Sequence, residues 1–375
     1  MTITIEATKA YEKEKTGVGW YTYYIVEQLL KVPSMEINFV FYLNPCIKSQ
    51  ISNLKSQKEN KKLKILRLHW PARYFWTQLR LSLEMMIHPP DVLFIPAHLP
   101  PLVHPKRLVI TVHDLAFKEY PNVYSKKELW LQEWGIRRVL KKAWRIITPS
   151  EFTKNEIVKY YPWADANKIF VVPHGVKKIS AKGGPASGWQ NFHSRSKTLL
   201  YIGRLEHKKN IINLIKAFNL LKKNYSLLTT HYSLILAGSP GFGYAAIRRE
   251  IATSPYKAAI QELGYLPHEE INDLLQTCSV FVFPSLYEGF GMPLLEACAQ
   301  GVPVACSDIM PFHEVGGDVP LYFNPHDPHD IAEKIHTLLN DKSLAQKKSA
   351  LGVARAHGYT WRRAAQKTLE VLTIS

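Results

Sequence analysis

The chain has 375 residues, of which 46% are hydrophobic and 21% charged, and its formal net charge is +17. This length is enough for two domains, and the composition is that of a globular protein rather than a disordered or fibrous one. No stretch approaches the roughly 18 apolar residues of a membrane span, and the N-terminal MTITIEATKAYEKEK lacks the apolar core of a signal peptide. The four scattered cysteines predict neither a disulfide framework nor a zinc site, so we expect a cytoplasmic protein.

The positive charge is concentrated in the first half of the chain. Residues 1–180 hold 28 Lys and Arg against 15 Asp and Glu, whereas residues 181–375 hold 20 against 16. A basic half predicts an anionic partner: nucleic acid, an acidic membrane surface or a phosphorylated substrate. A merely solubilising surface is the alternative.

Short apolar runs in the first half predict strands with helices between them. The runs are NFVFYL (38–43), KILRL (64–68), DVLFI (91–95), RLVITV (107–112) and RIITPS (145–150). Strands that alternate with helical stretches predict a parallel sheet with helical crossovers.

A second series of strands follows SAKGGPASGWQNFHSRSK (180–197), which is rich in Gly, Ser and basic residues and predicts a linker. The later strands are TLLYIG (198–203), YSLILAG (232–238), SVFVFPS (279–285) and VPVAC (302–306). We therefore predict an α/β chain of two doubly wound domains, 1–180 and 198–358, joined by the linker 181–197. The helix at 359–375 could cap either domain, and ligands would bind beyond the carboxyl ends of the strands.

Two motifs of the first half stand where a ligand could bind. In TGVGWYTYYIVEQLL, Gly17 and Gly19 precede an amphipathic helix and would let the backbone approach an anion at its N-terminus. In TVHDLAF, His113 and Asp114 directly follow an apolar strand. The alternatives are a tight turn for the glycines and a helix-capping Asp beside a structural His.

The motif YIGRLEHKKN follows the first strand of the second half. Gly203 clears space, and Arg204, Lys208 and Lys209 follow within six residues. A pyrophosphate needs converging cations, and Arg binds phosphate oxygens in a forked geometry. The alternative is a solvated run of charges.

The stretch SLYEGFGMPLLEACAQG places Glu288 and Glu296 on either side of a Gly-Phe-Gly turn. Pro293 fits the first turn of a helix and Gly301 fits its C-terminal cap, so we predict a helix from about Met292. The amides of Phe290, Gly291 and Met292 would then surround a helix N-terminus, which favours an anion. The alternative is that one carboxylate caps the helix and the other is solvated.

Several common signatures are absent from the sequence. It contains no D-x-D pair, no G-x-x-x-x-G-K-[ST], no G-x-S-x-G and no H-E-x-x-H, and the histidines show no metal-ligand spacing. We therefore expect neither a metal site nor a bound cofactor.

The whole series of motifs resembles the retaining GT-B glycosyltransferases of family 4, the glycosyl transferases group 1. The matching elements are TGVGWYT, TVHDLAF, ITPSEFTKNEI, VPHGV, YIGRLEHKKNI, ILAGSPG, GYLPHEEI and FVFPSLYEGFGMPLLEACAQGVPVACSD. The resemblance implies two Rossmann-like domains, a donor held mainly by the C-terminal one, and an acceptor held mainly by the N-terminal one. It also implies that the final helix packs back on the first domain.

The resemblance also implies a role for each matching residue. Glu288 would contact the donor sugar and Glu296 the ribose. Arg204 and Lys209 would neutralise the diphosphate, helped by the region of Gly19. The same set includes Gly203, the Gly291 amides, His113 beside the transferred sugar and Leu266 near the base.

The motifs look closest to bacterial mannosyltransferases. We expect transfer of a hexose, with mannose from GDP-mannose as the first choice, to a saccharide or lipid-linked acceptor in polysaccharide or glycolipid synthesis. The alternatives are transferases that use UDP-glucose, UDP-GlcNAc or UDP-galactose, a sugar-nucleotide epimerase of the same fold, and a non-catalytic binding protein. No nucleic-acid-binding motif supports the last of these.

The segment 48–86 predicts a location on a membrane. It interleaves nine Lys and Arg residues with Trp70, Tyr74, Phe75 and Trp76. This mixture suits the face of an anionic bilayer, so we expect peripheral attachment to the inner face of the membrane. The alternative is that the lysines are solvated and the aromatic residues belong to the core.

Overall fold

The computed structural model describes residues 1–32, 37–45, 63–71, 75–97, 99–177, 196–225 and 231–374. The chain divides into two compact units. Unit 1 comprises 1–119, 124–175 and 361–375, and unit 2 comprises 120–123 and 176–360. Of the linker predicted at 181–197, all but its last two residues lie outside the described residues.

Unit 1 is built on a seven-stranded parallel sheet in the order β3-β2-β1-β4-β5-β6-β7. Its strands are β1 (Thr2–Glu6), β2 (Asn38–Leu43), β3 (Leu63–Arg67), β4 (Val92–Ile95), β5 (Leu108–Thr111), β6 (Arg145–Thr148) and β7 (Ile169–Val171). Its α-helices are α1 (Gly17–Leu29), α2 (Leu81–Ile87), α3 (Ala116–Glu119), α4 (Lys126–Lys142), α5 (Glu151–Tyr160) and α15 (Trp361–Thr373). Shorter turns of helix are η1 (Thr8–Tyr11), η3 (Trp76–Arg80, a π-helix) and η5 (Ala166–Lys168).

Unit 2 is built on a six-stranded parallel sheet in the order β10-β9-β8-β11-β12-β13. Its strands are β8 (Thr198–Ile202), β9 (Ser233–Ala237), β10 (Ile260–Gly264), β11 (Val280–Phe283), β12 (Val304–Ser307) and β13 (Leu321–Phe323). Its α-helices are α7 (Ile211–Asn224), α9 (Tyr244–Thr253), α10 (His268–Thr277), α11 (Met292–Ala299), α12 (Met310–Gly316), α13 (Pro328–Asn340) and α14 (Lys342–Ala356). The 3-10 turns η4 (Pro121–Val123), η7 (His207–Lys209) and η8 (Lys257–Ala259) complete it.

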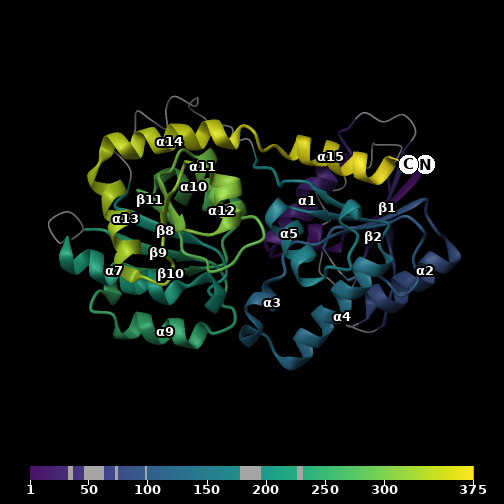
Figure 1. The fold of residues 1–375 in the computed structure, drawn as a ribbon, viewed down its shortest axis with the longest axis horizontal. Helices are drawn as coiled ribbons and strands as arrows, with labels where there is room; N and C mark the ends of the chain where they lie inside the picture. The colour runs from purple at the N-terminus through teal and green to yellow at the C-terminus, as the bar shows by residue number, and fades with distance from the viewer. Residues whose placement is uncertain are drawn as a thin grey trace. The chain divides into compact units, whose positions relative to one another are not determined.

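Both sheets have the doubly wound order, in which the chain runs outward from a central strand in one direction and then returns to run outward in the other. The helices of unit 2 pack in two groups, α7 with α9 and α13, and α11 with α12 and α14 (Figure 1). Strands covered on both faces are apolar throughout, and β4, β5, β11 and β12 are buried along their whole length. The predicted architecture of two doubly wound α/β domains is confirmed.

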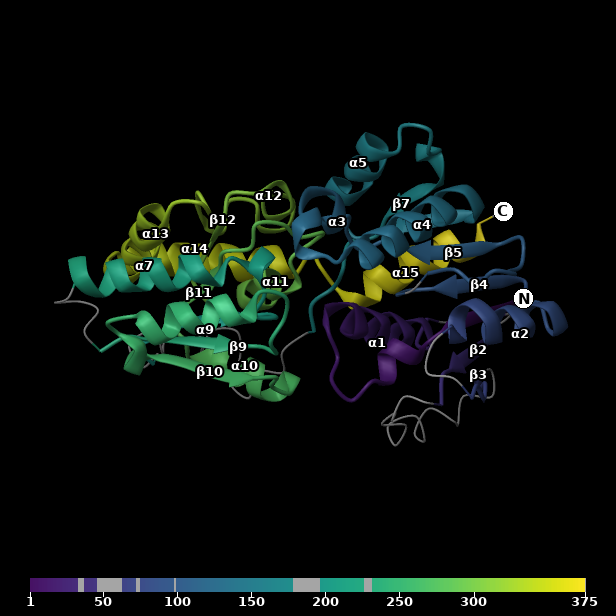
Figure 2. The same ribbon diagram turned by 90° about the horizontal axis from the view of Figure 1, so that it is seen from below.

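The C-terminal helix belongs to unit 1, where α15 packs along α1 (Figure 2). Trp361, its first residue, stacks on Tyr24 of α1 with ring centroids 5.0 Å apart. The chain reaches α15 through Thr360, which pairs with Val176 in an isolated parallel bridge of unit 2. No helix in the described part of the chain is long and apolar enough to cross a lipid bilayer.

The segment predicted to face a membrane, 48–86, is only partly described. Residues 46–62 and 72–74 lie outside the described residues, and with them five of its lysines, Arg73 and Tyr74. Trp76 does not suit a bilayer face: it is 4% exposed and its Nε1–H donates to the Leu68 carbonyl at 2.9 Å. For this residue the expectation was wrong, because the first turn of the helix directs Trp76 into the core.

Candidate functional site

The predicted cationic and acidic motifs meet at the centre of the sheet of unit 2. Strands β8 and β11 are neighbours, and the strand order reverses between them. In such sheets the loops that leave the carboxyl ends of these two strands diverge and form a binding crevice. Lys209 lies in η7, after β8, and Glu288 lies in the loop after β11.

Lys209 and Glu288 form an ion pair. The ammonium group of Lys209 donates to Oε1 of Glu288, and Ser285 Oγ donates to the same oxygen at 2.8 Å. Both charged side chains are about 15% exposed, at 14% and 15%. No hydrogen bond from the described residues reaches Oε2 of Glu288, so this oxygen can accept a bond from a ligand hydroxyl.

The turn η7 is fixed to its surroundings, which positions Lys209. Asn210 ends the turn in the left-handed conformation, with φ of 59°, and its Nδ2 donates to the Pro325 carbonyl. The Leu286 amide donates to the Lys208 carbonyl at 2.9 Å, which joins η7 to the loop that carries Glu288. The two loops therefore form one hydrogen-bonded structure.

Arg204 is held more loosely than Lys209. Its guanidinium lies 3.6 Å from Oε2 of Glu206, and the side chain is 55% exposed. Lys208 lies 3.7 Å from Oε1 of the same carboxylate. Glu206, which is 10% exposed, thus gathers two cations beside the Lys209–Glu288 pair. The exposed guanidinium of Arg204 is accessible to an anionic ligand.

The helix α11 begins at Met292, as predicted, and the two residues before it form a tight turn. Gly291 has φ of 99°, and a Cβ at this position would lie 2.9 Å from the ring of Phe312. The first bonds of the helix go from the Leu294 and Leu295 amides to the Gly291 carbonyl, so the amides of Gly291 and Met292 precede them. The positive φ and the close approach of Phe312 both require glycine at position 291. The N-terminus of the helix favours an anion.

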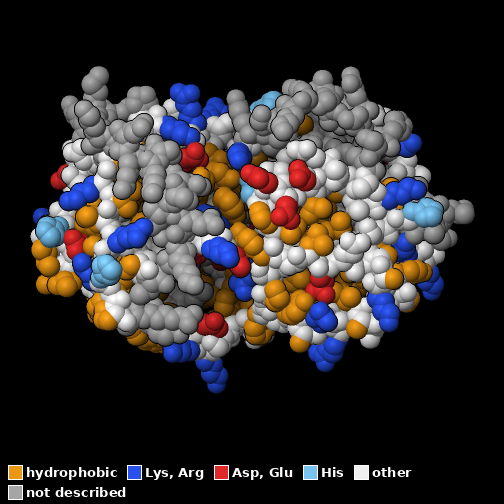
Figure 3. Space-filling model, turned by 180° about the vertical axis from the view of Figure 1, so that it is seen from behind, with side chains coloured by type: hydrophobic (Ala, Val, Ile, Leu, Met, Phe, Trp, Pro, Cys, Tyr) orange, Lys and Arg blue, Asp and Glu red, His pale blue; other side chains and the backbone are white. Residues whose placement is uncertain are grey.

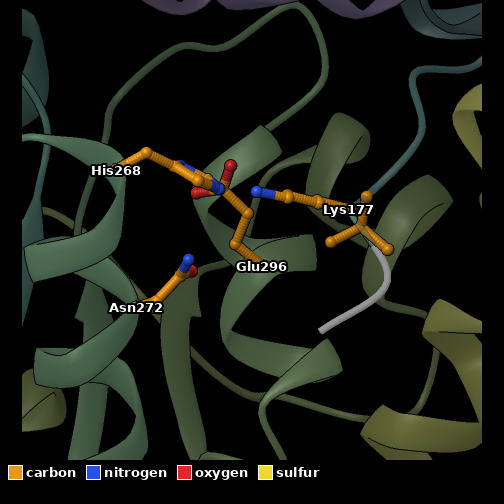
Figure 4. A pocket seen from close by; sticks show the side chains of 5 residues that line it. Lys177, His268, Asn272 and Glu296 are labelled. Carbon is orange, nitrogen blue, oxygen red and sulfur yellow. The ribbon is translucent and has the colours of Figure 1, made fainter. Parts of the chain in front are cut away.

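Glu296 lies one turn into α11 and lines a small pocket of unit 2. The other lining residues are Val176, Lys177, His268 and Asn272. Figure 4 shows the Glu296 carboxylate directed toward the ammonium group of Lys177, with the side chains of His268 and Asn272 from α10 beside it. The described residues supply no hydrogen bond to this carboxylate.

The pocket shifts the ionisation of its acid and its imidazole. Burial raises the pKa of Glu296 to about 7. The pKa of His268 is lowered by burial and by the nearby charge of Lys177. A carboxylate without a partner in such a place gains most from ligand groups that donate hydrogen bonds, such as the two hydroxyls of a ribose.

His113, which was predicted at the site, belongs to an aromatic cluster of unit 1. Nε2–H of His113 donates to the Pro96 carbonyl at 2.8 Å, and its ring meets Tyr21 edge-on at 4.8 Å. Tyr21 also contacts His174 at 4.6 Å. Asp114 has the alternative role named above, because its Oδ1 accepts from the Ala116 amide at the start of α3.

Gly17 and Gly19 are inside a helix rather than before it. Helix α1 begins at Gly17, so both glycines belong to its first turn, and Gly19 is buried. A Cβ at Gly19 would lie 3.1 Å from the Lys9 carbonyl oxygen. The prediction that both glycines precede the helix was wrong, because Thr16 is the N-cap residue and the helix begins at Gly17.

Several residues of the site were not predicted from the sequence, among them His268, which lies within the quoted motif GYLPHEEI. Ser285 stood at the end of a predicted strand, and Glu206 stood among the cations of YIGRLEHKKN, so both were within quoted motifs. Lys177 and Asn272 carry no local signal, since only the fold brings them to Glu296. Leu266, predicted near a base, lies in the loop between β10 and α10.

The described residues were also compared with the donor sets that bind metal ions. Among the described residues, no group of three or more His, Cys, Asp or Glu side chains could hold a metal ion. The charged groups at the site are instead the ion-paired side chains given above.

Comparisons with known proteins agree with this geometry. Residues 16–178 match the model of Glycosyltransferase Family 4, and residues 188–352 match that of Glycosyl transferases group 1. The chain is 28% identical to O-antigen chain mannosyltransferase B of Escherichia coli, over 97% of this chain and 98% of that one. It is 27% identical to O-antigen chain mannosyltransferase RfbU of Salmonella typhimurium, over 69% and 67% of the two chains.

The fold is also shared with a solved GT-B structure, HepE of Anabaena in complex with UDP and glucose. The TM-score is 0.73, with 15% identity, and the match covers 100% of this chain and 99% of that one. The two family models match successive parts of the chain that do not overlap. The predicted resemblance and enzyme class are therefore confirmed: the chain belongs to the GT-B glycosyltransferases of family 4, the glycosyl transferases group 1.

Proposed function

We propose that the chain transfers a hexose from a nucleoside diphosphate sugar, with retention of configuration, to a saccharide or lipid-linked acceptor. The observation that carries this proposal is the Lys209–Glu288 pair beside the N-terminus of α11. One oxygen of Glu288 is available to a sugar hydroxyl, while the cation and the helix end are suited to the adjoining phosphates.

The donor would extend across unit 2 from the sugar to the base. Glu288 holds the sugar hydroxyls, and Lys209 and Arg204 neutralise the diphosphate together with the amides near Gly291. Glu296 accepts hydrogen bonds from the ribose. The absence of any described protein donor to its carboxylate supports this role.

The remaining predicted residues complete the site in the same proposal. Leu266 packs near the base, and Gly203 keeps the turn after β8 open for the phosphates. Met292 contributes its backbone amide, and Phe290 its buried ring beneath the turn. From unit 1, His113 contacts the transferred sugar and the region of Gly19 approaches the diphosphate.

The chemistry requires stabilisation of a leaving diphosphate. As the bond between sugar and phosphate breaks, negative charge develops on the phosphate oxygens, and Lys209, Arg204 and the end of α11 stabilise it. The acceptor hydroxyl then attacks from the face that the diphosphate leaves and gives its proton to an oxygen of the departing phosphate, so the configuration is retained. We propose that these groups make a metal ion and any other cofactor unnecessary.

Mannose from GDP-mannose is the donor that we propose first, in the synthesis of a polysaccharide or glycolipid. The two relatives above are named as mannosyltransferases of the O-antigen chain. Transferases that use UDP-glucose, UDP-GlcNAc or UDP-galactose are the second candidate, and the UDP in the HepE structure favours it.

A screen of the four donors by thermal stabilisation tests this choice. A ligand at a hundredfold excess over its Kd stabilises the native state by about 2.7 kcal/mol, which raises Tm measurably. We expect a rise with GDP-mannose and GDP, and none with the UDP sugars. Stabilisation by a UDP sugar alone would replace mannose by the second candidate. An epimerase would convert its sugar nucleotide without any acceptor, so product analysis in the absence of acceptor separates the two enzymes.

We also propose that the enzyme is cytoplasmic and attaches peripherally to the inner face of the membrane, where a lipid-linked acceptor would be embedded. Much of the segment on which this expectation first rested lies outside the described residues. Its described residues 75–86 contribute to an exposed surface of unit 1.

A further inference from the structure

One face of the helix formed by η3 and α2 is apolar and exposed to solvent. Leu79, Leu83, Met86 and Ile87 are 46%, 47%, 63% and 58% exposed, and Phe75, just before the helix, is 67% exposed. Positions three or four residues apart lie along one side of a helix. The opposite side of this helix is buried in the core of unit 1. The helix is therefore apolar on both sides, although an ordinary surface helix exposes a polar face.

The apolar surface continues from α2 to the loop 101–103. Ser82 Oγ accepts hydrogen bonds from the amides of Leu102 and Val103, at 2.8 and 3.2 Å. Both of these apolar side chains are more than 40% exposed. The Leu102 carbonyl in turn accepts from Nη2 of Arg138 at 2.6 Å, which joins the loop to α4.

The exposed face of α4 combines aromatic rings with cations. Trp130 is 67% exposed and stacks on Trp134, and the guanidinium of Arg138 lies 5.8 Å from the ring of Trp134. Lys141, a turn further along, lies 5.7 Å from the ring of Trp163, which is itself exposed. Tryptophan and basic residues on one helix face are typical of a helix that lies at a membrane–water interface.

The acids of α4 are engaged away from this face. Glu128 closes a capping box with Ser125. Glu133 pairs with Lys118 and Arg137 and accepts from Tyr161. Among the described residues, no carboxylate lies within ion-pair distance of Lys127, Lys141 or Lys142. The face therefore carries a local excess of positive charge.

We propose that this surface docks unit 1 on an anionic lipid bilayer. We call it the α2–α4 surface and define it by the exposed side chains of Leu83, Met86, Leu102, Trp130 and Lys141, with the half-buried ring of Trp134 between them. Its apolar side chains would enter the boundary between headgroups and acyl chains, and its cations would lie against anionic headgroups. Figure 3 shows apolar side chains at the edge where α2 lies and further apolar areas elsewhere on the same face, with Lys, Arg, Asp and Glu side chains between them.

Charge decides between a bilayer and a second copy of the chain. A symmetric dimer through the α2–α4 surface would place its cations against those of the partner, which opposes association. An anionic bilayer has the complementary charge. The value of docking to the enzyme, access to a lipid-linked acceptor, rests on the proposed function, but the docking itself does not.

Co-sedimentation with vesicles tests the proposal. The full chain should bind vesicles that contain phosphatidylglycerol, bind pure phosphatidylcholine vesicles weakly, and lose binding as salt screens the charges. Two double variants separate the contribution of the cations from that of the apolar side chains. The pair Lys127→Glu and Lys141→Glu should lower partition into anionic vesicles by about tenfold or more. The pair Leu83→Ser and Trp130→Ala should lower it comparably at every salt concentration.

Matched controls come from an exposed helix of unit 2. Lys347 and Leu351 lie one turn apart on α14, and both are exposed. The pair Lys347→Glu and Leu351→Ala should leave vesicle binding unchanged. All variants should keep the parental circular dichroism and the parental thermal stabilisation by nucleotide, so a failure of folding or of the donor proposal is recognised separately.

Three results would overturn the proposal. One is equal binding of the parent to both kinds of vesicle. Another is an equal loss in the α14 control. The third is a concentration-dependent dimer, seen by analytical ultracentrifugation, that Leu83→Ser with Trp130→Ala dissociates, because it would assign the surface to a second copy of the chain.

Discussion

The six strands of unit 2 follow the order of the first six strands of unit 1, but the two units present different chemistry at the carboxyl ends of their strands. In unit 2, the loops after β8 and β11 bring together Lys209, Glu288, Arg204 and Glu206 as a set of ion pairs. In unit 1, the corresponding region holds the rings of Tyr21, His113 and His174. The shared topology therefore supplies a location for a site, and the loop residues decide whether charged or aromatic side chains lie there.

The largest effect is expected from the cation of unit 2. Lys209→Ala should lower kcat by roughly 10²–10³, the scale for losing one preorganised group at a developing charge. Steady-state kinetics with the stabilising donor measures it, and Lys216→Ala, at an exposed position on α7, is the control. Turnover near that of the parent would mean that the ion pair of unit 2 is structural, and the contrast between the units would then lose its functional meaning.

The turn before α11 should give the next largest effect. Gly291→Ala adds a Cβ 2.9 Å from Phe312 and forces φ of 99° on a residue with a side chain, so we expect a loss of about 2 kcal/mol in unfolding free energy. Gly264→Ala is the matched control, because Gly264 has φ of 68° and no neighbour within 4 Å of an added Cβ. Chemical denaturation measures both variants. If the two lose the same amount, the contact with Phe312 has no energetic weight.

A smaller effect with a distinctive pH dependence is expected from Glu296. Its pKa is raised from 4.5 to about 7, so the native state binds the proton more tightly than the unfolded chain does. Ionisation of this group therefore destabilises the native state as pH rises from about 4.5 to above 7, by roughly 3 kcal/mol at most. Glu296→Gln should thus be more stable than the parent at pH 8, with the difference vanishing toward pH 4.5.

The same variant should bind the donor about tenfold more weakly at pH 8, because the amide replaces a charged acceptor of the ribose hydroxyls. Thermal denaturation with and without nucleotide at several pH values measures both effects. A variant that is less stable than the parent at pH 8, yet binds donor normally, would make Glu296 a structural residue of unit 2.

The smallest effect is expected from metal removal. If the cations and the helix end of unit 2 are sufficient for the leaving diphosphate, excess EDTA should leave activity essentially unchanged. Loss of activity that Mg²⁺ or Mn²⁺ restores would contradict this. It would mean that carboxylates outside the ion pairs of unit 2 bind a metal ion.

Much of this architecture could be predicted because buried parallel strands are continuous apolar runs. The predicted strands at 38–43, 145–150 and 279–285 each contain an observed strand. The strands that were not predicted are β1, β7, β10 and β13. Three of them are edge strands, and β10 carries exposed polar residues because only part of it is covered.

The strand β1 was missed for a different reason. It is central in its sheet, but TITIE alternates Thr with Ile, and the N-terminal segment was interpreted only as lacking a signal peptide. At the site, the motifs identified Lys209, Glu288 and Glu296. Lys177 and Asn272, which line the pocket of Glu296, are brought there by crossings between distant segments. A local pattern contains no information about such crossings.

The loop that carries Arg204 has a consequence for how the enzyme can vary. Its backbone pairs with the loop after β9. The Leu205 amide donates to the Ser239 carbonyl, the Gly241 amide donates to the Leu205 carbonyl, and the His207 amide donates to the Phe242 carbonyl. At the start of the loop after β9, a Cβ on Gly238 would lie 1.8 Å from the carbonyl oxygen of Gly203, which starts the loop after β8. A residue inserted into the loop after β8 or the loop after β9 would shift the hydrogen-bond register between the two loops. Relatives that differ in the sugar they recognise are therefore expected to exchange side chains along these two loops, while the lengths of the loops change only together.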